Sequence, residues 1–89
     1  MKILIIEDSV RLADTIAEAL QNENYAVDTA NDGQLGYEHA STGIYDMVIL
    51  DLMLPKMNGY EVLSALRRDG QNVPVLILSA KTEIDDKIQ

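Results

Sequence analysis

Three carboxylates stand at the ends of two apolar segments and are the residues best placed to do chemistry. The apolar run 3–6 ends in Glu7 and Asp8, and the run 47–50 ends in Asp51. The carboxyl ends of parallel strands open into a shared crevice, so these acids would converge if the two segments pair as neighbouring strands. Like charges held together are costly unless a cation neutralises them. The pattern therefore predicts a metal site.

The residue types also indicate which chemistry such a site could support. An ionised aspartate is an oxygen nucleophile that needs no general base, so Asp51 could accept a phosphoryl group while a divalent ion offsets the developing charge. Asp8 and Asp51 suit Mg²⁺ as direct ligands, and Glu7 would more naturally hold a metal-bound water. Ser79 follows a third apolar run, 75–78, and its hydroxyl could donate to a phosphoryl oxygen.

Helix capping is the competing explanation for several of these residues. Asp8 or Ser9 could cap a following helix, Glu7 could lie in the favourable field of its N-terminus, and Ser79 could cap a later helix. Capping does not explain Asp51, because Leu-Met-Leu-Pro follows it and no helix is expected for several residues. The three strand ends taken together favour the phosphoryl site.

The elements that must position these residues alternate along the chain. Short apolar runs predict strands at 2–7, 25–30, 46–52 and 75–78. Between them, fourfold spacing of Leu12, Ile16 and Leu20 predicts one helix, and the turn 31–33 opens a second. Asn58 and Glu61 form a capping box for a third, and Thr82 would begin a fourth. Strands alternating with helices over short connections predict an α/β fold with a parallel sheet and right-handed crossovers.

Composition restricts the class of protein. The chain has 89 residues, enough for one domain, with 47% hydrophobic residues and no Cys. A formal net charge of −8 argues against direct nucleic-acid binding. No apolar run approaches a membrane span, and we expect no signal peptide, so a cytoplasmic location is predicted. Neither a P-loop nor a G-x-G-x-x-G motif is present, which disfavours nucleotide and dinucleotide sites.

Three sequence segments together resemble the receiver domains of bacterial two-component response regulators. They are Ile3-Leu4-Ile5-Ile6-Glu7-Asp8, then Asp51-Leu52-Met53-Leu54-Pro55 with Gly59, then Val75-Leu76-Ile77-Leu78-Ser79-Ala80-Lys81. The sequence around Asp51 and Ser79 is most similar to that of receivers of the OmpR/PhoB type, which precede a winged-helix DNA-binding domain. The resemblance runs the whole length of the chain, residues 1–89.

The resemblance implies a role for each site residue. Asp51 matches the phosphoacceptor, which takes its phosphoryl group from a sensor histidine kinase. Glu7 and Asp8 match the acidic pair that holds Mg²⁺, and Met53 matches the residue whose backbone carbonyl binds the metal. Ser79 matches the hydroxyl that turns toward the phosphate when the domain switches an output domain.

The resemblance also implies a flavodoxin-like, CheY-like three-layer fold, of which these 89 residues supply four strands in the order 2-1-3-4. The family's fifth strand and last helix, with its phosphate-binding lysine, would be missing from a receiver truncated in this way. We therefore expect exposed apolar surface, self-association of the chain and impaired phosphorylation.

Two other functions remain open from the sequence. The first is a Mg²⁺-dependent aspartyl phosphohydrolase, which the spacing disfavours because such enzymes place Asp-x-Asp after their first strand. The second is a natural or engineered fragment of the fold in which the acids are inherited but idle.

Overall fold

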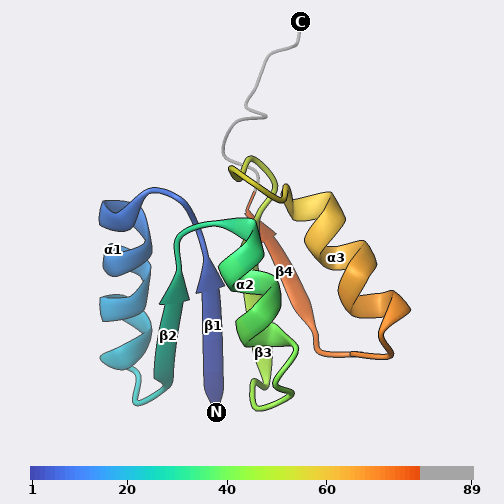
Figure 1. The fold of residues 1–89 in the computed structure, drawn as a ribbon. Coiled ribbons are helices and arrows are strands. Elements are labelled where there is room, and N and C mark those ends of the chain that lie inside the picture. Colours follow the sequence, from blue (N-terminus) through green and yellow to red (C-terminus); the bar gives the residue numbers. More distant parts are fainter. Residues whose placement is uncertain (79–89) are drawn as a thin grey trace, which may run out of the picture.

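The computed structural model of the protein describes residues 1–78, in which strands and helices alternate along the chain (Figure 1). The strands are β1 (Lys2–Ile6), β2 (Ala26–Ala30), β3 (Met47–Asp51) and β4 (Val75–Leu78). The helices are α1 (Val10–Gln21), α2 (Gly33–Ala40) and α3 (Gly59–Arg68). Each predicted element within the described residues is present, with bounds that differ by one or a few residues. The predicted helix at Thr82 lies outside the described residues, as does Ser79.

The strands form one parallel sheet in the order β2-β1-β3-β4, which confirms the predicted order (Figure 1). β1 and β3 are central neighbours, with Ile3 opposite Met47 and Ile6 opposite Leu50. The chain therefore leaves both strands at the same edge of the sheet. This register is what brings the residues after Ile6 close to the end of β3.

Helices cover both faces of the sheet and produce the predicted three layers. Ile3 and Ile5 of β1 pack with Ala13 and Ala17 of α1 on one face. The alternate residues, Leu4 and Ile6, belong to the core that α2 and α3 cover on the other face. Since both faces of a central parallel strand are buried, a continuous apolar run replaces the usual alternation of apolar and polar residues.

Side-chain caps fix where the helices begin. Ser9 caps α1, Asp32 caps α2, and Asn58 caps α3, where it forms the predicted capping box with Glu61. At the far end of α3, Gly70 adopts a positive φ of 82°, as expected of a helix stop. Within residues 1–78, the structure contains no helix that has both the length and the apolar character needed to cross a membrane.

The small residues of α1 are those that pack most tightly against the sheet. The small residues Ala13 and Ala17 are its buried positions, whereas Ile16 and Leu20 are partly buried and Leu12 is exposed. Alanines allow the helix to approach the sheet closely, so the larger residues are displaced to the border of the interface. Leu12 and Ile16 thereby become available to line a cavity beside the ends of the strands.

Candidate metal and phosphoryl site

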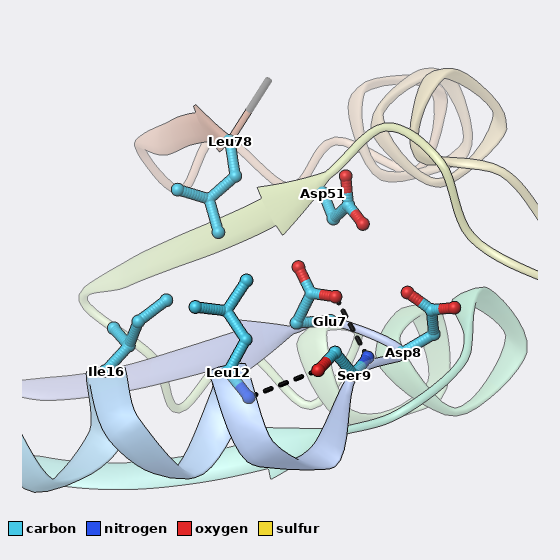
Figure 2. A pocket seen from close by; sticks show the side chains of 7 residues that line it. All are labelled: Glu7, Asp8, Ser9, Leu12, Ile16, Asp51 and Leu78. Carbon is cyan, nitrogen blue, oxygen red and sulfur yellow. Dashed lines mark hydrogen bonds between the residues drawn. The ribbon is translucent and has the colours of Figure 1, made fainter. Parts of the chain in front are cut away.

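The three predicted carboxylates meet at the carboxyl edge of the sheet. One carboxylate oxygen from each of Glu7, Asp8 and Asp51 lies within 4.8 Å of the others. Figure 2 shows Glu7 and Asp8 leaving the end of β1 and facing Asp51 at the end of β3. The predicted convergence of the acids is therefore present in the fold.

In the connection between β1 and α1, different residues cap the helix and face the candidate site. Ser9, not Asp8, caps α1: its Oγ accepts a hydrogen bond of 3.2 Å from the Leu12 N–H. The Ser9 N–H in turn donates to Glu7 Oε2 at 2.9 Å, which fixes the Glu7 side chain toward the helix N-terminus. The Asp8 side chain is exposed and is not used as the cap, so its oxygens can face a ligand.

The loop after β3 holds Asp51 in a tight turn. Asp51 is only 6% exposed, and its Oδ1 accepts a hydrogen bond of 3.1 Å from the Met53 N–H. The Gly59 N–H donates to the Leu52 carbonyl at 3.1 Å, so the loop closes back onto the end of the strand. A Cβ at Gly59 would lie 2.5 Å from the Asp51 carbonyl oxygen, and this close approach explains the glycine.

Electrostatics at the site favour a bound cation. Burial raises the pKa of Glu7 above its ordinary value, and the charges of Asp51 and Asp8 raise it further, against the lowering effect of the Ser9 N–H. The ionised cluster is therefore unfavourable in the protein alone. The donors are carboxylate oxygens, the ligand type that Mg²⁺ and Ca²⁺ prefer, so the residues present fit a hard divalent ion.

A cavity of about 370 Å³ opens beside the carboxylates. Figure 2 shows that one end is acidic, whereas Leu12, Ile16 and Leu78 line the other end. Leu78 is the last described residue, so the position of the Ser79 hydroxyl stays a prediction. The cavity joins a site for a charged group to an apolar surface on α1 and β4.

Met53 lies on the outer side of the site. Its side chain is exposed, and it borders a second hollow of about 490 Å³, which Asp8 and Tyr60 also line. The Met53 N–H binds Asp51, which places this residue next to the cluster. Its predicted role, a backbone carbonyl on the metal, stays a prediction.

Sequence reasoning missed two contributors to the site. Asn31 Nδ2 donates to the Glu7 carbonyl at 3.0 Å, and Gly33 packs against the backbone of the loop after β3. From the sequence alone, both residues indicate only a turn. The pairing of β1 with β2 is the feature that could have identified them, because it places residues 31–33 beside Glu7.

Comparison with known proteins identifies the family. Residues 3–89 match the response regulator receiver domain family. The chain belongs to this family. Among curated relatives, the transcriptional regulatory protein DltR of Streptococcus agalactiae is 42% identical over 88 residues, which are 99% of this chain and 39% of DltR. The response regulator ArlR of Staphylococcus aureus is 45% identical over 87 residues, 98% of this chain and 39% of ArlR. The receiver thus spans about two fifths of these relatives.

Solved receiver structures support the same assignment. The receiver domain of the Francisella response regulator 1452 superposes with a TM-score of 0.86 at 31% identity, covering 91% of this chain and 67% of that one. The response regulator TrrA of Thermotoga maritima, solved in complex with Mg²⁺-BeF, gives a TM-score of 0.85 at 32% identity, covering 92% and 71%. The protein is therefore a receiver domain of a two-component response regulator, a class made up mostly of signalling modules.

Proposed function

We propose that Asp51 is the phosphoacceptor of this receiver and that Mg²⁺ assists the transfer. The observation that carries the proposal is the convergence of three carboxylates within 4.8 Å, around a Glu7 whose pKa is raised by burial and further by its acidic neighbours. Asp8 and Asp51 would bind the ion directly, Glu7 would hold a metal-bound water, and the Met53 carbonyl would complete the protein ligands. When bound, the ion would offset negative charge on the phosphoryl oxygens.

The residues of the chain divide the remaining work. An Asp51 oxygen attacks phosphorus, and the bond from phosphorus to the donor's histidine nitrogen breaks, with the electron pair leaving on nitrogen. The Met53 N–H keeps Asp51 Oδ1 in place, which leaves Oδ2 to act as the nucleophile. Ser79, whose placement is not described, is proposed as the hydroxyl that turns toward the phosphoryl group and so reports its presence.

We further propose a sensor histidine kinase as the phosphoryl donor and a transcriptional output. Family membership supports the kinase, and the names of DltR and of the transcriptional regulatory protein PcoR of Escherichia coli support the output. A DNA-binding domain outside these 89 residues would read the switch, in a cytoplasmic setting. The receiver itself carries a net charge of −8, which suits a regulatory role better than direct contact with DNA.

Acetyl phosphate, a small phosphoryl donor, tests the proposal directly. The chain is incubated with acetyl phosphate and Mg²⁺, and its intact mass is recorded over time. We expect a gain of one phosphoryl group, incomplete in extent, that needs Mg²⁺ and is lost in Asp51→Asn. Asp28→Asn, which alters a distant carboxylate, is the matched control and should be modified like the wild type.

The outcomes also separate the competing functions. Modification that persists in Asp51→Asn would contradict the phosphoacceptor role. No modification of the wild type or of any variant would also contradict it, and would favour an idle site. Continuous release of phosphate from a phosphomonoester, which is too weakly activated to serve as the phosphoryl donor, would instead indicate a phosphohydrolase.

We also propose that copies of the chain associate through β4. This strand ends the described sheet, and its Leu76 and Ile77 are 52% and 37% exposed. A strand at the edge of a sheet, paired on one side only and carrying exposed apolar side chains, favours edge pairing or burial against another surface. Sedimentation velocity is the test: a mass that rises with concentration is expected, and a monomer throughout the micromolar range would refute association.

A further inference from the structure

The turn between β2 and α2, residues 31–33, supplies no carboxylate to the site yet contacts both segments that do. Asn31 is hydrogen-bonded to the segment after β1, and Gly33 to the loop after β3. We propose that this turn sets the spacing between Asp8 and Asp51, with Gly33 as a positioning residue for the metal site. The inference rests on the proposed function for its metal-binding readout.

On the β1 side, the turn fixes the peptide groups of Glu7. The Glu7 N–H donates to the Ala30 carbonyl at 3.0 Å, which continues the pairing of β1 with β2. The Glu7 carbonyl accepts from Asn31 Nδ2, also at 3.0 Å. Both backbone groups of Glu7 are thus held by consecutive residues, Ala30 at the end of β2 and Asn31 at the start of the turn, and Asp8 follows directly.

On the β3 side, the contact is between backbones. The Gly33 N–H donates to the Pro55 carbonyl at 3.3 Å. A Cβ at Gly33 would lie 1.5 Å from the Met57 carbonyl oxygen and 2.5 Å from its carbon. Because these are backbone atoms, no side-chain rotation can relieve the overlap, and an added methyl group must move the loop or the helix.

The loop can transmit such a displacement to Asp51. The two ends of the loop are joined by the hydrogen bond from the Gly59 N–H to the Leu52 carbonyl. A second hydrogen bond, from the Met57 N–H to the Pro55 carbonyl at 2.8 Å, tightens the loop. Lys56 between them has a positive φ of 70°, so the loop has little freedom to absorb a shift. Met53, which binds Asp51 through its N–H, lies within this same loop.

The nearby ion pair is a weaker link. Lys56 Nζ lies 3.8 Å from Asp32 Oδ2, and the lysine side chain is 71% exposed. Exposed pairs of this kind contribute little, so the packing of Gly33 on the loop backbone is the stronger constraint.

Gly36 provides a matched control in the same helix. The three atoms nearest to a Cβ at Gly36 would all be side-chain carbons of Ile6, the closest at 2.6 Å, in the core under α2. Gly33→Ala and Gly36→Ala therefore add the same methyl group to the same helix. Both are expected to lower stability by overpacking, but only the first acts on the loop after β3.

The experiment is a Mg²⁺ titration of the ¹⁵N-labelled chain followed by backbone amide chemical shifts. Gly36→Ala should bind Mg²⁺ with nearly wild-type affinity, whereas Gly33→Ala should bind roughly tenfold more weakly or worse, as is typical when residues that support metal ligands are changed. Asn31→Ala, which removes one hydrogen bond without adding volume, should weaken binding by a smaller factor. Before any metal is added, the amides of 52–54 should already be shifted in Gly33→Ala.

Each result decides something specific. Equal Mg²⁺ affinity in the two glycine variants, with unshifted amides at 52–54, would overturn the proposal while leaving the proposed function intact. If the wild type itself fails to bind Mg²⁺, the metal site is wrong, and the metal-free amide shifts still decide whether Gly33 positions the loop. If Gly33→Ala does not fold, unchanged affinity and unchanged amides at 7–9 in Asn31→Ala would overturn it.

Discussion

The two edges of the sheet carry charged clusters of opposite character. Toward the amino edge, Asp28 in the middle of β2 accepts a hydrogen bond of 2.6 Å from the Tyr45 hydroxyl and lies 3.6 Å from Lys2 Nζ. The Lys2 backbone N–H donates to Asp46 at 2.7 Å, so each acid there has a donor or a cation. At the carboxyl edge, Glu7, Asp8 and Asp51 face one another, and no salt bridge reaches them from within residues 1–78.

The pKa shifts show what this difference means energetically. The Tyr45 hydroxyl and the Lys2 charge lower the pKa of Asp28, so the fold favours its ionised form. Burial and like charges raise the pKa of Glu7, so the fold disfavours its ionised form. Within residues 1–78, one cluster is satisfied by the chain, whereas the other lacks a cationic partner, which a bound cation would supply. Unfavourable electrostatics at one edge of an otherwise consistent fold favour the carboxyl edge as the candidate functional site.

Metal binding should give the largest measurable difference between the two clusters. At a hundredfold excess over its dissociation constant, Mg²⁺ should raise the free energy of unfolding by about 2.7 kcal/mol, because it binds only the folded cluster. Asp8→Asn should lose most of this gain, whereas Asp28→Asn at the opposite edge should retain it. Urea unfolding with and without Mg²⁺ measures the gain; equal gains in both variants would mean that the ion binds elsewhere.

Charge removal without metal should have opposite signs at the two edges. Asp51→Asn keeps an oxygen for the Met53 N–H but removes a like charge. It should therefore stabilise the metal-free chain by roughly 1 kcal/mol, the repulsion of two unit charges about 4 Å apart in water. Asp28→Asn loses the attraction of Lys2 and a charge-assisted hydrogen bond, so it should destabilise by up to about 1 kcal/mol. Unfolding of both variants in chelator tests this. The contrast fails if Asp51→Asn is destabilising.

Most of the fold and the acidic cluster at the carboxyl edge could be predicted from the sequence, and the reasons are local. Apolar runs ending in acids identified the central strands and Asp51, because a strand buried on both faces has no polar residue until it leaves the sheet. Caps such as Asn58 were readable since their partners lie three residues away. The order 2-1-3-4 came from the family resemblance, and the observed sheet confirms it.

What the sequence did not reveal depends on contacts between distant segments. Tyr45 and Asp28 are 17 residues apart, and Asn31 and Glu7 are 24 apart. Neither pair has a motif, because each contact exists only once the strands are in register. The same holds for Gly33. A side chain is excluded at this position by the backbone of a loop more than twenty residues away in the sequence. The role of Ser79 stays a prediction for a different reason, since it lies outside the described residues.

The smallest expected effect, a dependence of stability on pH, sharpens the comparison further. Glu7 has a folded-state pKa above its ordinary 4.5, so the folded chain binds more protons than the unfolded chain between 4.5 and that raised value. Its contribution to stability therefore falls as the pH rises through this window. Asp28 has a pKa below its ordinary 3.8, so its contribution is present above 3.8 and is lost as the pH falls through the lowered value.

Glu7→Gln isolates the first of these contributions, because glutamine can still accept the Ser9 N–H but does not ionise. The difference in free energy of unfolding, variant minus wild type, should grow in chelator as the pH is raised from 4.5, and Mg²⁺ should reduce or reverse it. Denaturant melts at several pH values, with and without the ion, give this difference directly. A difference that stays flat with pH would mean that the acids at the carboxyl edge are as well accommodated as those at the amino edge, and the electrostatic case for a cation would fail with it.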